Sequence, residues 1–87
     1  DMKPLNEFLN EEIQVNFKQT RKGEREDIIV VTDGDIEFEV HYPADGYDTP
    51  YGIALPNEEI IRGLNKDRKA KSLYKKYKSN IENFTNS

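Results

Sequence analysis

The stretch DIIVVTDGDIEFEVHY at positions 27–42 constrains the fold more than any other part of the sequence. Two runs rich in β-branched and aromatic residues flank Asp33 and Gly34, and an Asp-Gly pair in that setting is typical of a β-hairpin with a type I′ turn, whose two central residues need positive φ. Alternate positions of the second run share one apolar face: Ile36, Phe38, Val40 and Tyr42. The sequence therefore predicts antiparallel strands at 27–32 and 35–42.

Further strand and helix patterns flank this hairpin. EIQVNFKQ alternates apolar and polar residues, which predicts a strand at 12–18, and the shorter alternation in YGIAL leaves open a further edge strand at 51–55. Apolar residues spaced three and four apart in MKPLNEFLN predict a short helix at 3–10.

Two more helices are predicted at 57–65 and 67–84, capped by Asn57 and Asp67. One continuous helix would move its apolar residues from one side to the other, at about 100° per residue, and a small core cannot use two opposite faces. We therefore expect a break near Asn65-Lys66.

These elements predict an α+β fold: a small antiparallel β-meander of three to four strands, with a short N-terminal helix and two C-terminal helices packed on one face. At 87 residues the chain has room for a single domain, 1–87, with one modest core. It has no cysteine, which removes disulfides, thiolate zinc sites and cysteine nucleophiles. With no apolar run of about 18 residues and no signal-peptide pattern, we expect a cytoplasmic protein.

Charge is distributed unevenly along the chain. Residues 1–59 carry five basic and fifteen acidic side chains, whereas residues 60–87 carry eight basic and two acidic ones, within a net charge of −4. Opposite charge on the two parts indicates a partner for at least one of them, unless they screen each other within the fold.

Catalytic and metal chemistry find little support in the sequence. His41 is the single histidine, and neither a Gly-x-Ser-x-Gly motif nor a Gly-rich phosphate loop is present, so we expect neither an enzyme nor a bound cofactor. Glu37, Glu39 and His41 share one face of a predicted strand, but neighbours on that face are about 7 Å apart, too far to share a metal without a second strand. They are interpreted as an acidic docking surface, or as the solvated side of the sheet.

The last predicted helix carries a basic stripe on the side opposite Leu73. Its members are three and four residues apart: Arg68, Lys71, Lys75 and Lys78. Nucleic-acid phosphates or an acidic protein surface would suit this stripe, and a solvated face is the alternative. The pI near 5.0 argues against a dedicated DNA-binding protein.

The segment HYPADGYDTPYGI, at 41–53, joins the strands to the helices. Tyrosines in such a proline-constrained loop are typical of a protein interface, because tyrosine offers large, rigid, amphipathic contacts; the alternative is that they cover the sheet edge. With a one-residue gap, these 13 of 87 residues resemble the segment joining the last helices of the immunity proteins of DNase-type colicins. The matching positions are His41-Tyr42-Pro43, Gly46, Asp48, Thr49-Pro50 and Gly52-Ile53. That family is all-helical, whereas the preceding segments here are predicted strands, so the resemblance is local.

We therefore expect a small non-enzymatic protein-binding module, such as an inhibitor of the immunity, antitoxin or phage-encoded type, with no metal, no cofactor and no membrane partner. Its expected contact residues are Glu37, Glu39, His41, Tyr42, Tyr47, Asp48 and Tyr51. The alternative is a nucleic-acid-associated protein that binds phosphates through the basic stripe. A third hypothesis is a detached domain of a larger protein.

Overall fold

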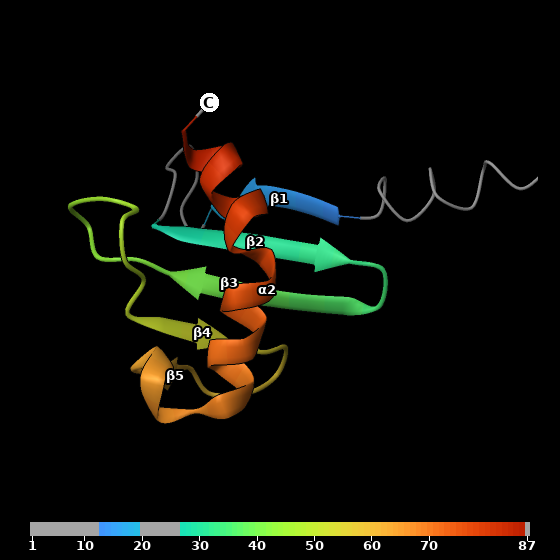
Figure 1. The fold of residues 1–87 in the computed structure, drawn as a ribbon, viewed down its shortest axis with the longest axis vertical. Coiled ribbons are helices and arrows are strands. Elements are labelled where there is room, and N and C mark those ends of the chain that lie inside the picture. The colour runs from blue at the N-terminus through green and yellow to red at the C-terminus, as the bar shows by residue number, and fades with distance from the viewer. Residues whose placement is uncertain (1–12, 20–26, 87) are drawn as a thin grey trace, which may run out of the picture.

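The computed structural model describes residues 13–19 and 27–86. Within them, five strands form one antiparallel sheet in the order β1-β2-β3-β4-β5, and one α-helix, α2, runs across one face of it (Figure 1). The elements are β1 (Ile13–Phe17), β2 (Ile28–Asp33), β3 (Ile36–His41), β4 (Gly52–Ala54), β5 (Ile61–Arg62), the short 3-10 helix η1 (Leu64–Lys66) and α2 (Arg68–Thr85). Strands that follow one another in sequence are also neighbours in the sheet, so the α+β meander that the sequence predicts is present.

The central hairpin joins β2 to β3 through a different turn from the predicted one. Pairing of Asp33 with Ile36 leaves Gly34 and Asp35 as the two central residues. Gly34 has φ of 60°, whereas Asp35 does not have positive φ. Positive φ at the first central position alone is the type II′ pattern, in which glycine takes that position. The prediction of a type I′ turn centred on Asp33 and Gly34 was wrong, because the turn lies one residue later: β2 ends at Asp33 and β3 begins at Ile36.

The hydrophobic core lies between α2 and the sheet face that it covers. Its fully buried residues come from β2, β3, the start of the following loop, β4 and α2: Ile29, Val31, Phe38, Val40, Tyr42, Ile53, Ala70, Tyr77 and Ile81. The Tyr77 ring packs on the Phe38 ring with centroids 5.6 Å apart. At about 25 cal/mol per Å² of buried apolar surface, such aromatic contacts are the main source of stability in a small domain.

The segment predicted as a helix at 57–65 forms no α-helix, and only its last two residues belong to the 3-10 helix η1. β5 pairs with β4 there, with Ile61 opposite Ile53, and η1 follows. Asn57 has φ of 62°, in the left-handed region, so it forms part of a turn instead of capping a helix. The segment is extended because β5 supplies hydrogen-bonding partners for the backbone at the free edge of β4, which adds a fifth strand to the sheet. The described residues therefore have five strands and one C-terminal α-helix; the predicted helix at 3–10 lies outside them.

Gly52 allows the backbones of β4 and β5 to approach each other closely. A Cβ at this position would lie 2.9 Å from the carbonyl oxygen of Ile61 and 2.9 Å from the side chain of Ile60. Only glycine fits such a backbone approach without a shift.

The last helix begins where the sequence predicts, directly after Asp67. Asp67 is extended, and its Oδ1 accepts a hydrogen bond of 2.9 Å from the backbone N–H of Ala70, which caps α2. Ala70, Tyr77 and Ile81 are the buried residues of α2 and lie on one face of it, which packs on the sheet.

Candidate binding surfaces

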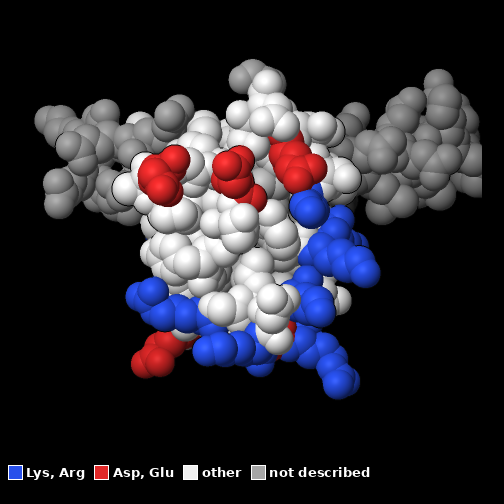
Figure 2. Space-filling view, turned by 60° about the vertical axis from the view of Figure 1, so that its left-hand side comes forward, with Lys and Arg blue, Asp and Glu red and all other residues white. Residues whose placement is uncertain are grey.

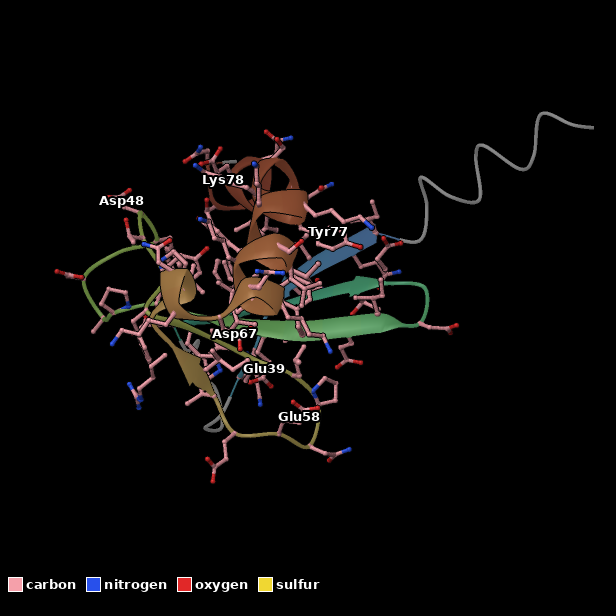
Figure 3. All side chains as sticks on the ribbon, turned by 60° about the horizontal axis from the view of Figure 1, so that its bottom comes forward. Glu39, Asp48, Glu58, Asp67, Tyr77 and Lys78 are labelled. Carbon is pink, nitrogen blue, oxygen red and sulfur yellow. The ribbon has the colours of Figure 1, made fainter. Side chains whose placement is uncertain are left out.

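The sheet face turned away from α2 is the first candidate surface, here called the open face. Glu37, Glu39 and His41 lie on it, because they alternate along β3 with the buried Phe38 and Val40. Figure 3 shows Glu39 on the side of the sheet opposite α2. No helix or strand among residues 13–19 and 27–86 packs over this face.

A three-residue network crosses the open face. The Nζ of Lys18 lies 2.6 Å from Oε2 of Glu39, and the Nε2 of His41 lies 2.9 Å from Oε1 of the same carboxylate. The strand register explains the meeting: the N–H of Lys18 donates to the carbonyl of Ile28, which pairs with His41. Lys18 and His41 therefore lie in one row across the sheet. Sequence reasoning missed Lys18, because the register between distant strands cannot be read from one strand alone.

Partial burial raises the pKa of Glu39, but hydrogen bonds to Lys18 and His41, together with electrostatic attraction to these side chains, outweigh burial, so the pKa of Glu39 lies below its ordinary value. The carboxylate is therefore ionised over a wider pH range than an isolated glutamate. It is also fixed in orientation, because each of its oxygens has a partner.

Tyr51 borders the open face and is exposed. It is 40% accessible, and the guanidinium of Arg62 lies 5.2 Å from the centre of its ring. The His41 ring meets it edge-on, with centroids 6.1 Å apart. The backbone positions this tyrosine, because its N–H donates to the carbonyl of His41 at 2.8 Å. An arginine stacked on a tyrosine is a composition that protein interfaces favour.

A small notch opens beside the network, between β3, β4 and the turn that follows β4. Its volume is 170 Å³. It is lined by Glu37, Phe38, Glu39, Ala54, Leu55, Pro56, Asn57 and Glu58. Three of these are carboxylates and none is basic. In the described part of the chain, no three acidic or histidine side chains are gathered closely enough to hold a metal ion. The notch suits one larger organic cation better, because its carboxylates are spread around the rim.

Two tyrosines of the predicted interface lie in the core. Tyr42 is 2% exposed, and its ring packs against that of Tyr47 with centroids 5.2 Å apart. Tyr47 in turn packs on Phe17, which packs on Phe84. The prediction of Tyr42 as a contact residue was wrong, since it continues the apolar face of β3 beyond the strand. Tyr47 is half-buried in the same cluster, where the aromatic rings close one end of the core.

The hydroxyl of Tyr42 is buried without a hydrogen-bond partner among the described residues. Burial, followed by the nearby hydroxyl of Tyr74, which lies outside hydrogen-bonding geometry, raises the pKa of Tyr42 well above its usual range. An unpaired buried hydroxyl costs about 1–3 kcal/mol.

The second candidate surface is a groove beside α2, called the basic groove. It has a volume of 590 Å³ and lies between the loop at 48–50, η1 and α2. Its lining is Asp48, Thr49, Pro50, Leu64, Asn65, Lys71, Tyr74, Lys75, Lys78 and Glu82. The structure thus brings Asp48 of the predicted protein-binding loop beside three lysines of the basic stripe, while Arg68 lies outside the groove. In Figure 3, Asp48 and Lys78 lie on the same side of α2.

Charge is segregated around this part of the molecule. On the face that Figure 2 shows, basic side chains gather along the right-hand side and the lower end, where acidic atoms also appear at the lower left, and acidic side chains form a row near the top. The uneven charge of the sequence therefore becomes a spatial separation of charge.

In the described part of the chain, no helix has both the length and the apolar character needed to cross a bilayer.

Comparisons with known proteins found no relative of this chain. The strands around His41 and Gly52 also differ from the all-helical fold of the colicin immunity proteins that the 41–53 segment resembles. No family model, curated protein or solved structure matches this chain.

Proposed function

We propose that the protein is a non-enzymatic module that binds a basic region of a partner protein on its open face. The observation that carries the proposal is the 170 Å³ notch, in which Glu37, Glu39 and Glu58 surround a space with no basic side chain in its lining. Arginine fits this site best, because a planar guanidinium makes paired, charge-assisted hydrogen bonds to carboxylates. Leu55, which is half-buried beside the carboxylates, offers apolar surface for the aliphatic part of the same side chain.

The residues around the notch also favour binding of a basic partner. Glu39 is held by Lys18 and His41, so little side-chain freedom is lost when a partner binds. Tyr51 and Arg62 extend the surface with residue types that dominate binding energy at interfaces. Such a face would serve an inhibitor of the immunity, antitoxin or phage-encoded type, which would cover the basic residues with which its target holds an anionic substrate.

A short fluorescent peptide of alternating arginine and glycine tests the notch directly. We expect Glu37→Gln/Glu58→Gln to weaken binding of this peptide at least about tenfold, because each lost charged hydrogen bond removes more than about 1 kcal/mol. The matched control is Asp45→Asn/Asp48→Asn, which removes the same charge from the exposed loop and should change affinity by less than about twofold. Equal weakening by the two double variants would show a general charge effect and would contradict the proposal.

The same variants make a search for the natural partner specific. The wild-type protein and both double variants are immobilised and exposed to a lysate of the source organism. A captured protein supports the proposal when Glu37→Gln/Glu58→Gln releases it and Asp45→Asn/Asp48→Asn retains it. A partner that all three retain binds elsewhere on the molecule.

A further inference from the structure

We propose that the basic groove binds a phosphate-bearing ligand of about mononucleotide size. This site is separate from the open face and does not depend on the function proposed above. Its volume of 590 Å³ lies within the range of small-molecule sites, which is about 300–1,000 Å³. Three lysines of α2 line it, together with polar groups from the loop at 48–50 and from η1.

The position of the phosphate follows from the pairing of the lysines. Lys78 lies 4.0 Å from Glu82, which partly neutralises it. The ion pairs among residues 13–19 and 27–86 do not include Lys71 or Lys75. One helical turn separates these two lysines, so both ammonium groups can reach one anion. The lining holds three lysines and two carboxylates, Asp48 and Glu82. Since Glu82 is paired with Lys78, the part of the groove nearest Lys71 and Lys75 is where a dianion would bind.

The rest of the groove is larger than a phosphate needs. Tyr74 offers a half-buried aromatic ring, and Leu64 and the buried Pro50 supply apolar surface around it. A planar heterocycle can stack on such a ring. Asp48 can accept hydrogen bonds from hydroxyl or amino groups, and Asn65 can both donate and accept. Anion-binding and ring-binding groups thus occur in one groove.

A buried hydroxyl next to the lining of the groove has unused hydrogen-bonding capacity. The buried hydroxyl of Tyr42 lies beside Tyr74 and within electrostatic reach of Glu82, and both of these residues line the groove. The Tyr42 hydroxyl has no partner among the described residues. A ligand that moves the Tyr74 hydroxyl slightly inward would satisfy it.

The groove favours one phosphate group over a continuous nucleic-acid tract. Arg68, the first member of the basic stripe, lies outside it, and the loop at 48–50 forms its opposite wall. Tract binding requires several phosphate contacts in succession, each releasing counterions, whereas this groove concentrates charge at one position. A free nucleotide and the 5′ end of a strand both carry such a phosphomonoester.

Two-dimensional NMR titrations with four probes test the proposal: inorganic phosphate, adenosine 5′-monophosphate, and a short single-stranded oligonucleotide with and without a 5′ phosphate. We expect the nucleotide to bind at least tenfold more tightly than inorganic phosphate, with shifts confined to Thr49, Asn65 and residues 71–78. Tighter binding of the phosphorylated oligonucleotide would assign the strand end as the source, and tighter binding of the nucleotide would assign the free ligand. Nucleotide binding no tighter than that of inorganic phosphate, or shifts outside the groove, would overturn the proposal.

Two charge-matched double variants locate the phosphate. Lys71→Gln/Lys75→Gln should lower nucleotide affinity at least tenfold, and Arg68→Gln/Lys69→Gln should change it less than twofold, although all four residues are exposed on α2. Circular dichroism confirms that each variant is folded, and Lys75→Glu alone provides a second test of the same position. Equal losses in the two double variants would show that the helix attracts anions without a site.

Discussion

Two buried tyrosines provide a test of packing, because removing the same hydroxyl group should have opposite effects at the two positions. The hydroxyl of Tyr77 donates a hydrogen bond of 2.5 Å to Oδ2 of Asp33, across the interface between α2 and β2. The hydroxyl of Tyr42 is buried without a partner among the described residues. Both rings are almost fully buried, at 1% and 2% exposure, so phenylalanine keeps their apolar contacts.

The expected free-energy changes follow from these environments. Tyr77→Phe removes a hydrogen bond to a carboxylate, worth about 1.5–3 kcal/mol, and we expect the lower end because the half-exposed Asp33 regains water. Tyr42→Phe removes an unsatisfied polar group and should stabilise the protein by about 1–3 kcal/mol. The two variants should therefore differ by about 3 kcal/mol, which for a domain of this size is roughly 12 °C or more in melting temperature.

Urea unfolding followed by circular dichroism measures both changes, and equal m-values would show that the unfolded states are comparable. Burial, followed by the hydrogen bond to Asp33, raises the pKa of Tyr77 to about 12 from an ordinary value of 10.0. A raised tyrosine pKa gives stability that is fully present below pH 10 and is lost as pH rises through the folded-state value. Tyr77→Phe should therefore also reduce the loss of stability above pH 10. Destabilisation by both substitutions would refute the assignment of an unpaired hydroxyl to Tyr42.

Four further substitutions test the sheet. Phe38→Ala should lower the free energy of unfolding by roughly 3–5 kcal/mol, whereas Glu37→Ala on the open face should change it by less than about 0.5, measured by urea unfolding; the reverse order would mean that β3 faces the other way. Gly52→Ala should destabilise the domain, because its Cβ would meet the carbonyl oxygen of Ile61 at 2.9 Å; an unchanged melting temperature would contradict this close approach. The lowered pKa of Glu39 gives stability that is present above pH 4.5 and is lost as pH falls through the folded-state value. Glu39→Gln should therefore reduce the loss of stability at acidic pH, measured by urea unfolding at several pH values. An unchanged loss would count against the Lys18–Glu39–His41 network.

Sequence patterns predicted the parts of the fold that depend on local periodicity. The alternation from Ile36 to Val40 and the helical spacing from Ala70 to Ile81 each specify a face, and both faces are buried as predicted. Ile36 is an exception at 39% exposure, because it lies at the hairpin end where little of α2 covers the sheet. The 57–65 segment was mispredicted for a related reason: a two-residue strand shows no periodicity, and its pairing with β4 is a tertiary contact.

The candidate sites depend on contacts that periodicity does not carry. Glu39 and His41 were correctly placed together on one face, but Lys18 joins them only through the register of β1, β2 and β3. Asp48 and Lys75 were assigned to two competing hypotheses, yet they line one groove. A single sequence shows which side chains could share a face of one element, while the meeting of different elements is settled by packing.

The order of the elements also has a consequence for folding during synthesis. All five strands precede α2 in the chain, and α2 supplies the surface that covers the apolar side of the sheet. While the ribosome has released only the strands, Phe38 and Val40 have no helix to pack against, and a partly formed sheet with a bare apolar face is prone to aggregate. Release of α2 therefore controls when the domain can fold. Because neighbouring strands are also sequential, the local contacts are ready to form quickly once the helix is available.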